Sequence, residues 1–304
     1  MTTIDRWLHT DQTSCFDEGG NEVDCLRSGQ DGAYGPIAGN PQNRFSVTNA
    51  FVEDKWTGLV WHRDANVAEF PLSWEEAYQL VREMNRSQHS GRSDWRLPER
   101  EELFSLISHQ AINPCLQQNH PFRNVFHGYY WTGTECARLP NQAWYIHLGG
   151  GRVYRGMKHG SYMVWPVSRS EPESTIIKDR FVKQTHAFYD RLTRRTWLND
   201  KWLDIGAVTW RQALDRIKRL NEKKVAGCRD WRLPNIRELE SLVDVTSHSP
   251  AIAAGHFFQS VHEGYWSATT SLYEPRYAWV LYTKDGAIGV GYKPQQDFYV
   301  LAIR

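Results

Sequence analysis

The sequence contains no long run of apolar residues. A membrane-spanning helix needs about 18 or more such residues in a row, and no segment of this chain approaches that length. The chain also lacks an excess of either charge, with 36 Lys and Arg against 35 Asp and Glu, whereas nucleic-acid-binding proteins usually carry a basic excess. These absences argue against insertion into a membrane and against a nucleic-acid partner.

Motifs for metal binding and catalysis are also missing. The sequence has no Cys-x-x-Cys pair, no His-Glu-x-x-His motif and no recognisable triad order among its 12 histidines. Oxygen-bearing side chains gather in one loop, at Asp17, Glu18, Asn21 and Asp24, and calcium prefers such ligands. Because their spacing is not that of an EF-hand loop, we expect no cofactor, with calcium as the one alternative.

The five cysteines are unevenly placed. Cys15 and Cys25 flank a stretch rich in turn-forming residues, which predicts a disulfide. Cys115 and Cys136 can form a second bridge, which leaves Cys228 over; the alternative is five free thiols in a reduced protein. Disulfides persist in oxidising compartments, so we expect an extracellular or cell-envelope location. The first six residues do not read as a signal peptide, so a cytoplasmic location stays the alternative.

A pentapeptide that occurs twice reveals an internal repeat. Asp94-Trp95-Arg96-Leu97-Pro98 returns as Asp230-Trp231-Arg232-Leu233-Pro234, 230 − 94 = 136 residues later. Matching residues continue on both sides, and a one-residue slip after Gly128 then matches Arg169 with Arg304. The period is far longer than the roughly 20–50 residues of solenoid repeats, so each copy should have its own core.

These observations predict the domain organisation. A polar, Gly-rich leader is expected to pack on the first copy as an irregular arm, tied down by the disulfide. The segments are a leader over 1–44, a first copy over 45–170, a linker over 171–180 and a second copy over 181–304.

Each copy has the same predicted order of elements. A short strand precedes an amphipathic helix, which a capping box opens at Ser73 or Thr209. The pentapeptide leads into a second helix, running through Leu103 to Ile107 in the first copy, whose first turn can hold the Pro. Hairpin turns are expected at 149–151 and 284–286. Strands are expected at 57–61, 129–132, 143–148 and 162–167, and at 194–198, 265–267, 277–282 and 298–303.

The combined pattern resembles the DUF1566 family, which includes the C-terminal domain of the Legionella collagen-like adhesin. The residues that carry the resemblance are the strand at 57–61, the Trp-x-x-Ala helix, Asp-Trp-Arg-Leu-Pro, Glu-Leu-x-Ser-Leu and a terminal Val-x-Arg or Ile-Arg. The resemblance covers nearly the whole chain. It implies an α+β fold of tandem C-type-lectin-like domains, each with two helices packed on short antiparallel sheets. The sequence departs from the family pattern at the opening of the second copy, where Arg194-Arg195 replace Gly58-Leu59.

The same resemblance bears on catalysis. Lectin-like domains are related to the formylglycine-generating enzymes, whose oxidase activity would need a copper-binding cysteine pair late in the domain. Residues 240–304 contain no cysteine, and copper of this kind needs soft thiolates. We therefore expect that the protein is not an enzyme.

The residues of the repeated pentapeptide are expected to be structural. A buried Asp94–Arg96 pair beside a packed Trp95 would pin the loop between helix and sheet, because Arg favours bidentate contact with carboxylates. The counterparts in the second copy are Asp230, Trp231 and Arg232.

Aromatic and basic residues interleave around the predicted hairpin turns. Such side chains can stack on sugar rings and pair with sulfates or carboxylates, and the resemblance implies that ligands bind in this late-loop region. The alternative is a plain solvated face. The candidates are Arg138, Arg152, Tyr154, Arg155 and Lys158 in the first copy and Tyr273, Arg276, Tyr277 and Lys293 in the second.

The sequence thus predicts a non-catalytic recognition protein that binds a polysaccharide or a protein at or outside the cell surface. One alternative is a structural subunit of an extracellular assembly, in which exposed edge strands meet further copies of the chain. The other is an enzyme of unrecognised chemistry, which would show a deep pocket with a perturbed carboxylate or histidine.

Overall fold

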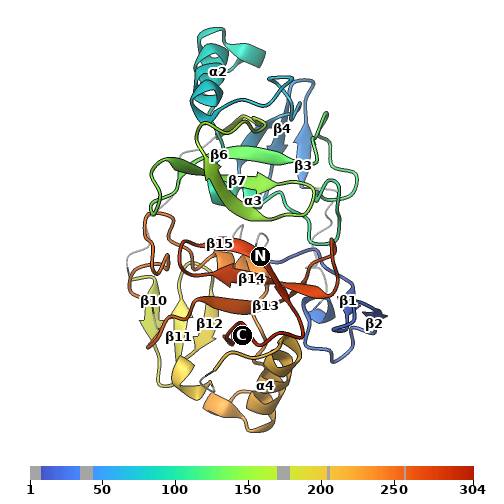
Figure 1. The fold of residues 1–304 in the computed structure, drawn as a ribbon, viewed down its shortest axis with the longest axis vertical. Helices are drawn as coiled ribbons and strands as arrows, with labels where there is room; N and C mark the ends of the chain where they lie inside the picture. Colours follow the sequence, from blue (N-terminus) through green and yellow to red (C-terminus); the bar gives the residue numbers. More distant parts are fainter. Residues whose placement is uncertain (1–7, 35–43, 170–178, 204–205, 257) are drawn as a thin grey trace. The chain divides into compact units, whose positions relative to one another are not determined.

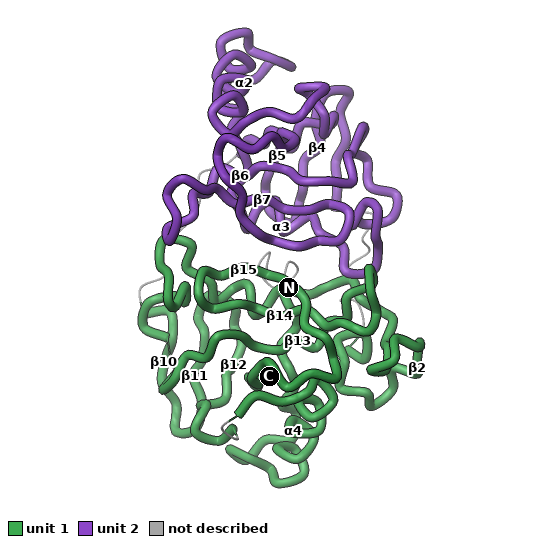
Figure 2. Tube along the Cα trace, in the orientation of Figure 1, with its two compact units in different colours: residues 1–37, 175–304 green, residues 38–174 purple. Residues whose placement is uncertain are grey.

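The computed structural model describes residues 8–34, 44–169, 179–203, 206–256 and 258–304. The linker predicted over 171–180 lies almost entirely outside the described residues. The chain divides into two compact units, drawn in different colours in Figure 2. Unit 2 comprises Ala38–Ser174 and holds the first copy, whereas unit 1 comprises Met1–Ile37 and Thr175–Arg304 and holds the second copy.

In the first copy, two helices accompany two sets of antiparallel strands (Figure 1). One set has the order β3-β4-β5-β9, and the other runs β6, β7, β8 as successive hairpins. The elements are β3 (Phe45–Val47), β4 (Phe51–Asp54), β5 (Leu59–His62), α2 (Trp74–Arg86), α3 (Arg100–Phe104), β6 (Tyr129–Glu135), β7 (Gln142–His147), β8 (Val153–Met157) and β9 (Val167–Arg169).

The second copy repeats this arrangement, which confirms an α+β architecture in two tandem copies. Its strands again form antiparallel sets, β10-β11-β12 and β13-β14-β15. The elements are β10 (Phe181–Lys183), β11 (Ala187–Asp190), β12 (Arg195–Leu198), α4 (Trp210–Glu222), α5 (Ile236–Glu240), β13 (Gly264–Thr270), β14 (Tyr277–Tyr282) and β15 (Ala287–Tyr292). The leader adds β1 (Cys15–Phe16), β2 (Glu22–Val23) and the 3-10 turn Asp31–Tyr34.

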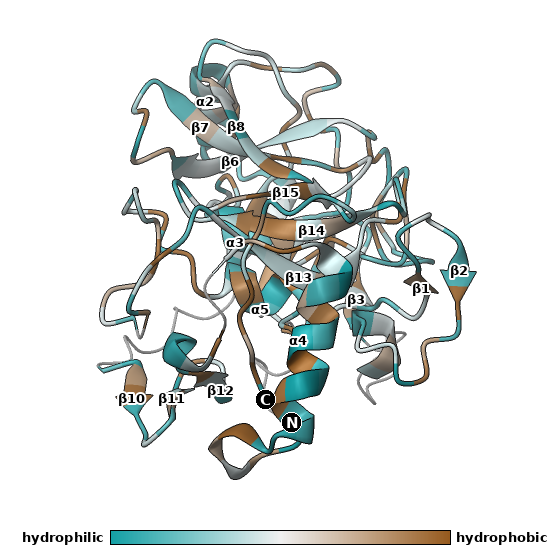
Figure 3. Ribbon diagram, turned by 60° about the horizontal axis from the view of Figure 1, so that its bottom comes forward, coloured by the Kyte–Doolittle hydropathy of each residue, from teal (hydrophilic) through white to brown (hydrophobic). Residues whose placement is uncertain are grey.

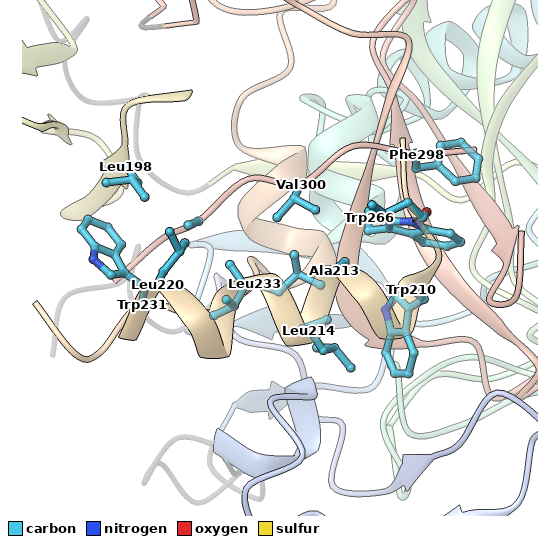
Figure 4. Close-up of a cluster of buried hydrophobic side chains, with 14 of the residues drawn as sticks. Leu198, Trp210, Ala213, Leu214, Leu220, Trp231, Leu233, Trp266, Phe298 and Val300 are labelled. Carbon is cyan, nitrogen blue, oxygen red and sulfur yellow. Dashed lines mark hydrogen bonds between the residues drawn. The ribbon is translucent and has the colours of Figure 1, made fainter. Parts of the chain in front are cut away.

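The long helix of each copy forms as the sequence predicts. Capping boxes open α2 at Ser73 and α4 at Thr209. Apolar residues at helical spacing give α4 one buried face, and Figure 3 shows its alternating hydrophilic and hydrophobic bands. Figure 4 shows side chains of this face beside Trp266, Phe298 and Val300, in a cluster that also contains Trp231.

The second helices are shorter than predicted. Each is a single turn of five residues, and the Pro of the pentapeptide precedes the N-cap residue, Glu99 or Asn235, instead of lying in the first turn. After α3 the chain turns at Ser105 and Leu106 and pairs at Ile107 with Leu116, so the helix does not continue as predicted. The strands predicted at 162–167 and 298–303 pair mainly through isolated bridges. Among the described residues of these segments, a continuous strand forms at β9, which begins at Val167.

The leader packs on the second copy, so the prediction that it packs on the first is wrong. Gln12 donates to the Thr270 carbonyl (2.8 Å) and accepts from its N–H (2.9 Å). The carboxylate of Asp31 accepts from the hydroxyls of Thr10 and Thr269, each at 2.6 Å. The predicted Cys15–Cys25 disulfide is present in this leader.

In the first copy, the carboxylate that accepts from the matching threonine belongs to the copy itself and not to the leader. Thr134 matches Thr269, and its hydroxyl donates to the Glu99 carboxylate at 2.6 Å. Glu99 matches Asn235, which has no carboxylate. A buried hydroxyl needs an acceptor in either copy, and the two copies obtain it from different parts of the chain.

The second predicted disulfide is not formed, because Cys115 and Cys136 are buried thiols that are not bonded to each other. Their backbones pair at opposite ends of β7: Cys115 donates to Leu148, and Cys136 donates to Gln142. Six residues of strand span about 20 Å, whereas a disulfide needs Cα atoms within about 7 Å. The strand between them therefore rules out the bridge.

Candidate functional site

The arginine of the repeated pentapeptide pairs with a glutamate of the following helix, not with the aspartate of its own motif. In the first copy, Arg96 contacts both carboxylate oxygens of Glu102, at 2.6 and 2.7 Å. Arg169 adds a third contact at 3.0 Å. These contacts hold the pKa of Glu102 below its ordinary value despite its burial.

The second copy builds the same cluster with one different partner. Arg232 contacts Glu238 through both guanidinium nitrogens, and Arg195 contacts it at 3.0 Å. The charges of Arg232 and Arg195 overcome burial and lower the pKa of Glu238 to about 2. Strand register matches Val167 with Ile303, so Arg304 matches Ser168 rather than Arg169. Arg195 lies where the sequence departs from the family pattern. It contacts Glu238 in the way that Arg169 contacts Glu102 in the first copy.

The aspartates of the pentapeptides lie at the periphery. Asp94 accepts from Arg92 and from the Ser168 hydroxyl (2.8 Å), and the Asp230 side chain is 66% exposed, with Arg304 at 3.5 Å. The tryptophans are buried, and each ring N–H donates to a backbone carbonyl. Each tryptophan ring thus ties the pentapeptide to the 3-10 turn that follows the long helix of its copy.

Tyrosines gather on one face of the β6–β7–β8 strands in the first copy. Register places Tyr145 opposite Tyr154 and Tyr129 opposite His147. Tyr129 lies 4.9 Å from Tyr145, 5.3 Å from Tyr162 and 4.8 Å from His147, measured between ring centroids. We call these five residues the tyrosine face. Tyr129 and Tyr154 remain 44% and 48% exposed.

The tyrosine face is neutral and rich in hydroxyl groups. Burial, together with Tyr162, raises the pKa of Tyr145 to about 12, so its phenol stays protonated at physiological pH. Burial and then the charge of Arg152 lower the pKa of His147, which favours the uncharged imidazole. Gly156 leaves room for the Tyr162 ring, because a Cβ there would lie 2.6 Å from the Tyr162 hydroxyl.

The chain matches one family model twice, over residues 50–168 and 186–304, and that model describes the Lcl C-terminal domain. The two matches span most of the chain. The protein belongs to the Lcl C-terminal domain family. The resemblance to DUF1566-type domains is thereby confirmed in both copies. No curated protein matches the chain.

The second Lcl C-terminal copy has no aromatic ring at three of the five positions of the tyrosine face, whereas Tyr282 matches His147. Strand register aligns Tyr129 with Gly264, Tyr145 with Val280 and Tyr154 with Gly289. Matching bridges align Tyr162 with Phe298. The two Lcl C-terminal copies thus share a scaffold and differ in the surface that it displays.

The candidates of the second Lcl C-terminal copy do not form one surface. Lys293 is fully buried, and its ammonium donates to the leader carbonyls of Phe16 and Asp17 at 3.1 and 3.2 Å. Arg276 is paired with Glu274 at 2.9 Å. Tyr277 packs against Tyr292, whereas Tyr273 is 61% exposed and the Arg276 side chain 52% exposed. The leader therefore occupies part of the zone for which the sequence predicted ligand binding.

Candidates of the first copy contact aromatic and acidic residues of the β6–β7–β8 strands and of α2. Arg152 is exposed across the hairpin turn from His147, and the Arg155 guanidinium carbon lies 4.7 Å from the Tyr154 ring centroid. Lys158 pairs with Glu135 at 3.1 Å and lies over the Trp74 ring, whereas Arg138 is half-buried. The sequence analysis missed Tyr129, Tyr145, His147 and Tyr162 as a group. The 149–151 hairpin turn was the available signal, since it fixes which residues of β7 and β8 face each other.

In the loop considered for calcium, the Asp17 carboxylate accepts hydrogen bonds from within the loop. Asp17 accepts from the N–H and the side-chain amide of Asn21, which shapes the turn between β1 and β2. Among the helices of the described residues, none combines the length and the apolar character needed to cross a bilayer.

Proposed function

We propose that this protein is a non-catalytic recognition protein that binds a polysaccharide outside the cell through the tyrosine face of its first copy. The observation that carries the proposal is the cluster of partly exposed tyrosines on one sheet face, at positions where the second copy has Gly264, Val280 and Gly289. Since the shared scaffold folds without these rings, their presence in the first copy calls for a reason beyond folding. Membership of the Lcl C-terminal domain family supports an adhesin-like role.

The chemistry of the face suits a sugar ligand. Aromatic rings offer apolar surface, and tyrosine hydroxyls offer hydrogen bonds to the same ligand. Strand pairing holds Tyr145 and Tyr154 opposite each other, so little order has to be acquired on binding. Arg152 and Arg155 bring positive charge to the margin, where they can pair with sulfate or carboxylate groups of an acidic polysaccharide.

The fold and location form part of the same proposal. Each copy adopts a C-type-lectin-like fold, and polysaccharide binding is assigned to the first copy alone. The Cys15–Cys25 disulfide supports an oxidising, extracellular location. The interface between ligand and protein would then rest on loops and strands held by a rigid scaffold.

Binding of the non-reduced protein to a glycan array, including sulfated glycosaminoglycans, tests the proposal at physiological salt. Tyr129→Ala and Tyr154→Ala should each lower binding at least tenfold, because both rings are exposed in the free protein. Tyr273→Ala, which removes a still more exposed tyrosine of the second copy, is the control and should bind normally. Arg152→Ala should weaken only the salt-sensitive part of binding.

A blank array with a folded protein would refute polysaccharide binding. Tyrosine clusters also serve as the anchors of protein interfaces, so a protein ligand would then become the leading candidate. Normal binding by both tyrosine variants would refute the tyrosine face as the site, whatever the ligand.

A further inference from the structure

Two histidines of the first copy, neither of them part of the tyrosine face, point their ring nitrogens at each other. His62 is the last residue of β5 and is buried, whereas His89 begins the 3-10 turn after α2 and is exposed. Their Nε2 atoms lie 3.2 Å apart. We propose that His62 and His89 form a binding site for a divalent transition-metal ion, held by the two Nε2 atoms.

The distance between the nitrogens fits a shared ion. Histidine nitrogens lie about 2.0–2.1 Å from a bound zinc ion. Two such nitrogens are about 2.9–3.4 Å apart when the angle at the metal lies between 90° and 109°. The observed 3.2 Å falls in this range. The same distance also suits a hydrogen bond between the two rings.

The first support is the tautomer of His62. Its Nδ1 lies 2.9 Å from the Asp64 carbonyl oxygen and 3.2 Å from the Asp64 backbone nitrogen. The shorter contact is to an oxygen that can only accept, and it is made by the tautomer whose Nδ1 carries the proton. The Nε2 of a neutral ring then presents a lone pair to His89. Metal-binding histidines commonly donate their second ring N–H to a backbone carbonyl in this way.

The second support is the comparison with the second copy. The matched positions there are Leu198 and Val225, which belong to one apolar cluster. The turn has the same backbone in both copies, with left-handed residues at Gln88 and Ser90 and at Lys224 and Ala226. The fold therefore places these two positions in contact without histidine, and a polar pair is not required for folding.

The chemistry of the pair indicates the class of ion. Imidazole nitrogens suit copper, nickel and zinc, and among divalent first-row ions copper binds such ligands most tightly. No group of three or more His, Cys, Asp or Glu suited to a metal is found within the described parts of the chain. The ion would thus have two protein ligands and keep open positions for water or for a group of a bound molecule, unlike a closed structural site.

A copper titration of the untagged full chain tests the proposal. Calorimetry counts the ions bound, and the electron paramagnetic resonance spectrum of copper reports nitrogen ligands. His89→Ala should remove one bound ion or weaken it at least tenfold, because the exposed His89 ring is half of the site. The exchange His62→Leu with His89→Val, which installs the residues of the second copy, should do the same while the fold is retained. His127→Ala, an exposed histidine of the same copy, is the control.

The possible results distinguish a metal site from a hydrogen bond between the two histidine rings. Loss of one ion in the His89 variants with an unchanged His127 variant would establish the site. If the wild type binds no copper, or if the double exchange binds as many ions as tightly as the wild type, the two rings form only a hydrogen bond and the proposal is overturned. Circular dichroism of each variant verifies the fold, and His89→Ala alone decides should the double exchange fail to fold.

Discussion

Replacing Glu238 with Gln should destabilise unit 1 strongly. The carboxylate contacts Arg232 through two nitrogens and Arg195 at 3.0 Å, and its side chain is 1% exposed. Glutamine keeps the size but removes the charge, so two buried guanidinium groups lose their counter-ion. Removing one partner from a buried ion pair costs about 3–5 kcal/mol.

The pKa of the same group gives an independent magnitude. Folding lowers the pKa of Glu238 from 4.5 to about 2, which corresponds to about 3 kcal/mol of stability. For a depressed carboxylate this stability is fully present above pH 4.5 and is lost as the pH falls toward 2. The difference between wild type and Glu238→Gln should therefore be constant from pH 7 to 5 and shrink below pH 4.5.

The first copy provides the matched comparison, Glu102→Gln. Its partner Arg96 is 37% exposed, against 16% for Arg232, so water compensates more of the lost charge and the cost should be about 1–2 kcal/mol. Thermal unfolding followed by calorimetry would separate the transitions of the two units. An equal or larger effect of Glu102→Gln, or a Glu238→Gln effect below about 1 kcal/mol, would refute this account of the ion cluster.

Two further predictions concern the leader. Replacing Cys15 and Cys25 with Ser should lower the stability of unit 1 by about 2–3 kcal/mol and leave the unfolding transition of the first copy in place; a shift of that transition instead would contradict the assignment of the leader. Burial raises the pKa of Asp31 from 3.8 to about 6, so the folded state holds the proton more tightly and unit 1 should lose about 3 kcal/mol as the pH rises from 4 to 6. Asp31→Asn should abolish this slope in denaturant unfolding, and an unchanged slope would assign it to another group.

Local sequence patterns predicted the local structure well. The capping boxes at Ser73 and Thr209 and the apolar periodicity of both long helices are contained within short windows, and both are confirmed. The strands β8 and β15 were not predicted. Glycines interrupt the alternation of side chains in both strands, at Gly156 in β8 and within Ala287–Tyr292 in β15. Their pairing is set by neighbouring strands and not by their own propensity.

Contacts between distant residues were the part that patterns could not supply. Glu102 and Glu238 were seen as repeated residues, but six residues separate each from its Arg, and a one-turn helix gives no periodicity from which to infer the pairing. The attachment of the leader joins Gln12 to Thr270 across 258 residues, and no local signal encodes a partner at that range. The tyrosine face likewise became visible only once strand register was known.

The leader also imposes an order of events during synthesis. Asp31 leaves the ribosome 269 − 31 = 238 residues before Thr269, its partner in the second copy. At about 5–20 residues per second, this delay lasts roughly 10–50 seconds. The first copy, which has its own acceptor in Glu99, can complete its fold during that interval. The thiols of Cys15 and Cys25 can meet an oxidant before the leader docks, so the disulfide can form first and present the second copy with a hairpin that is already closed.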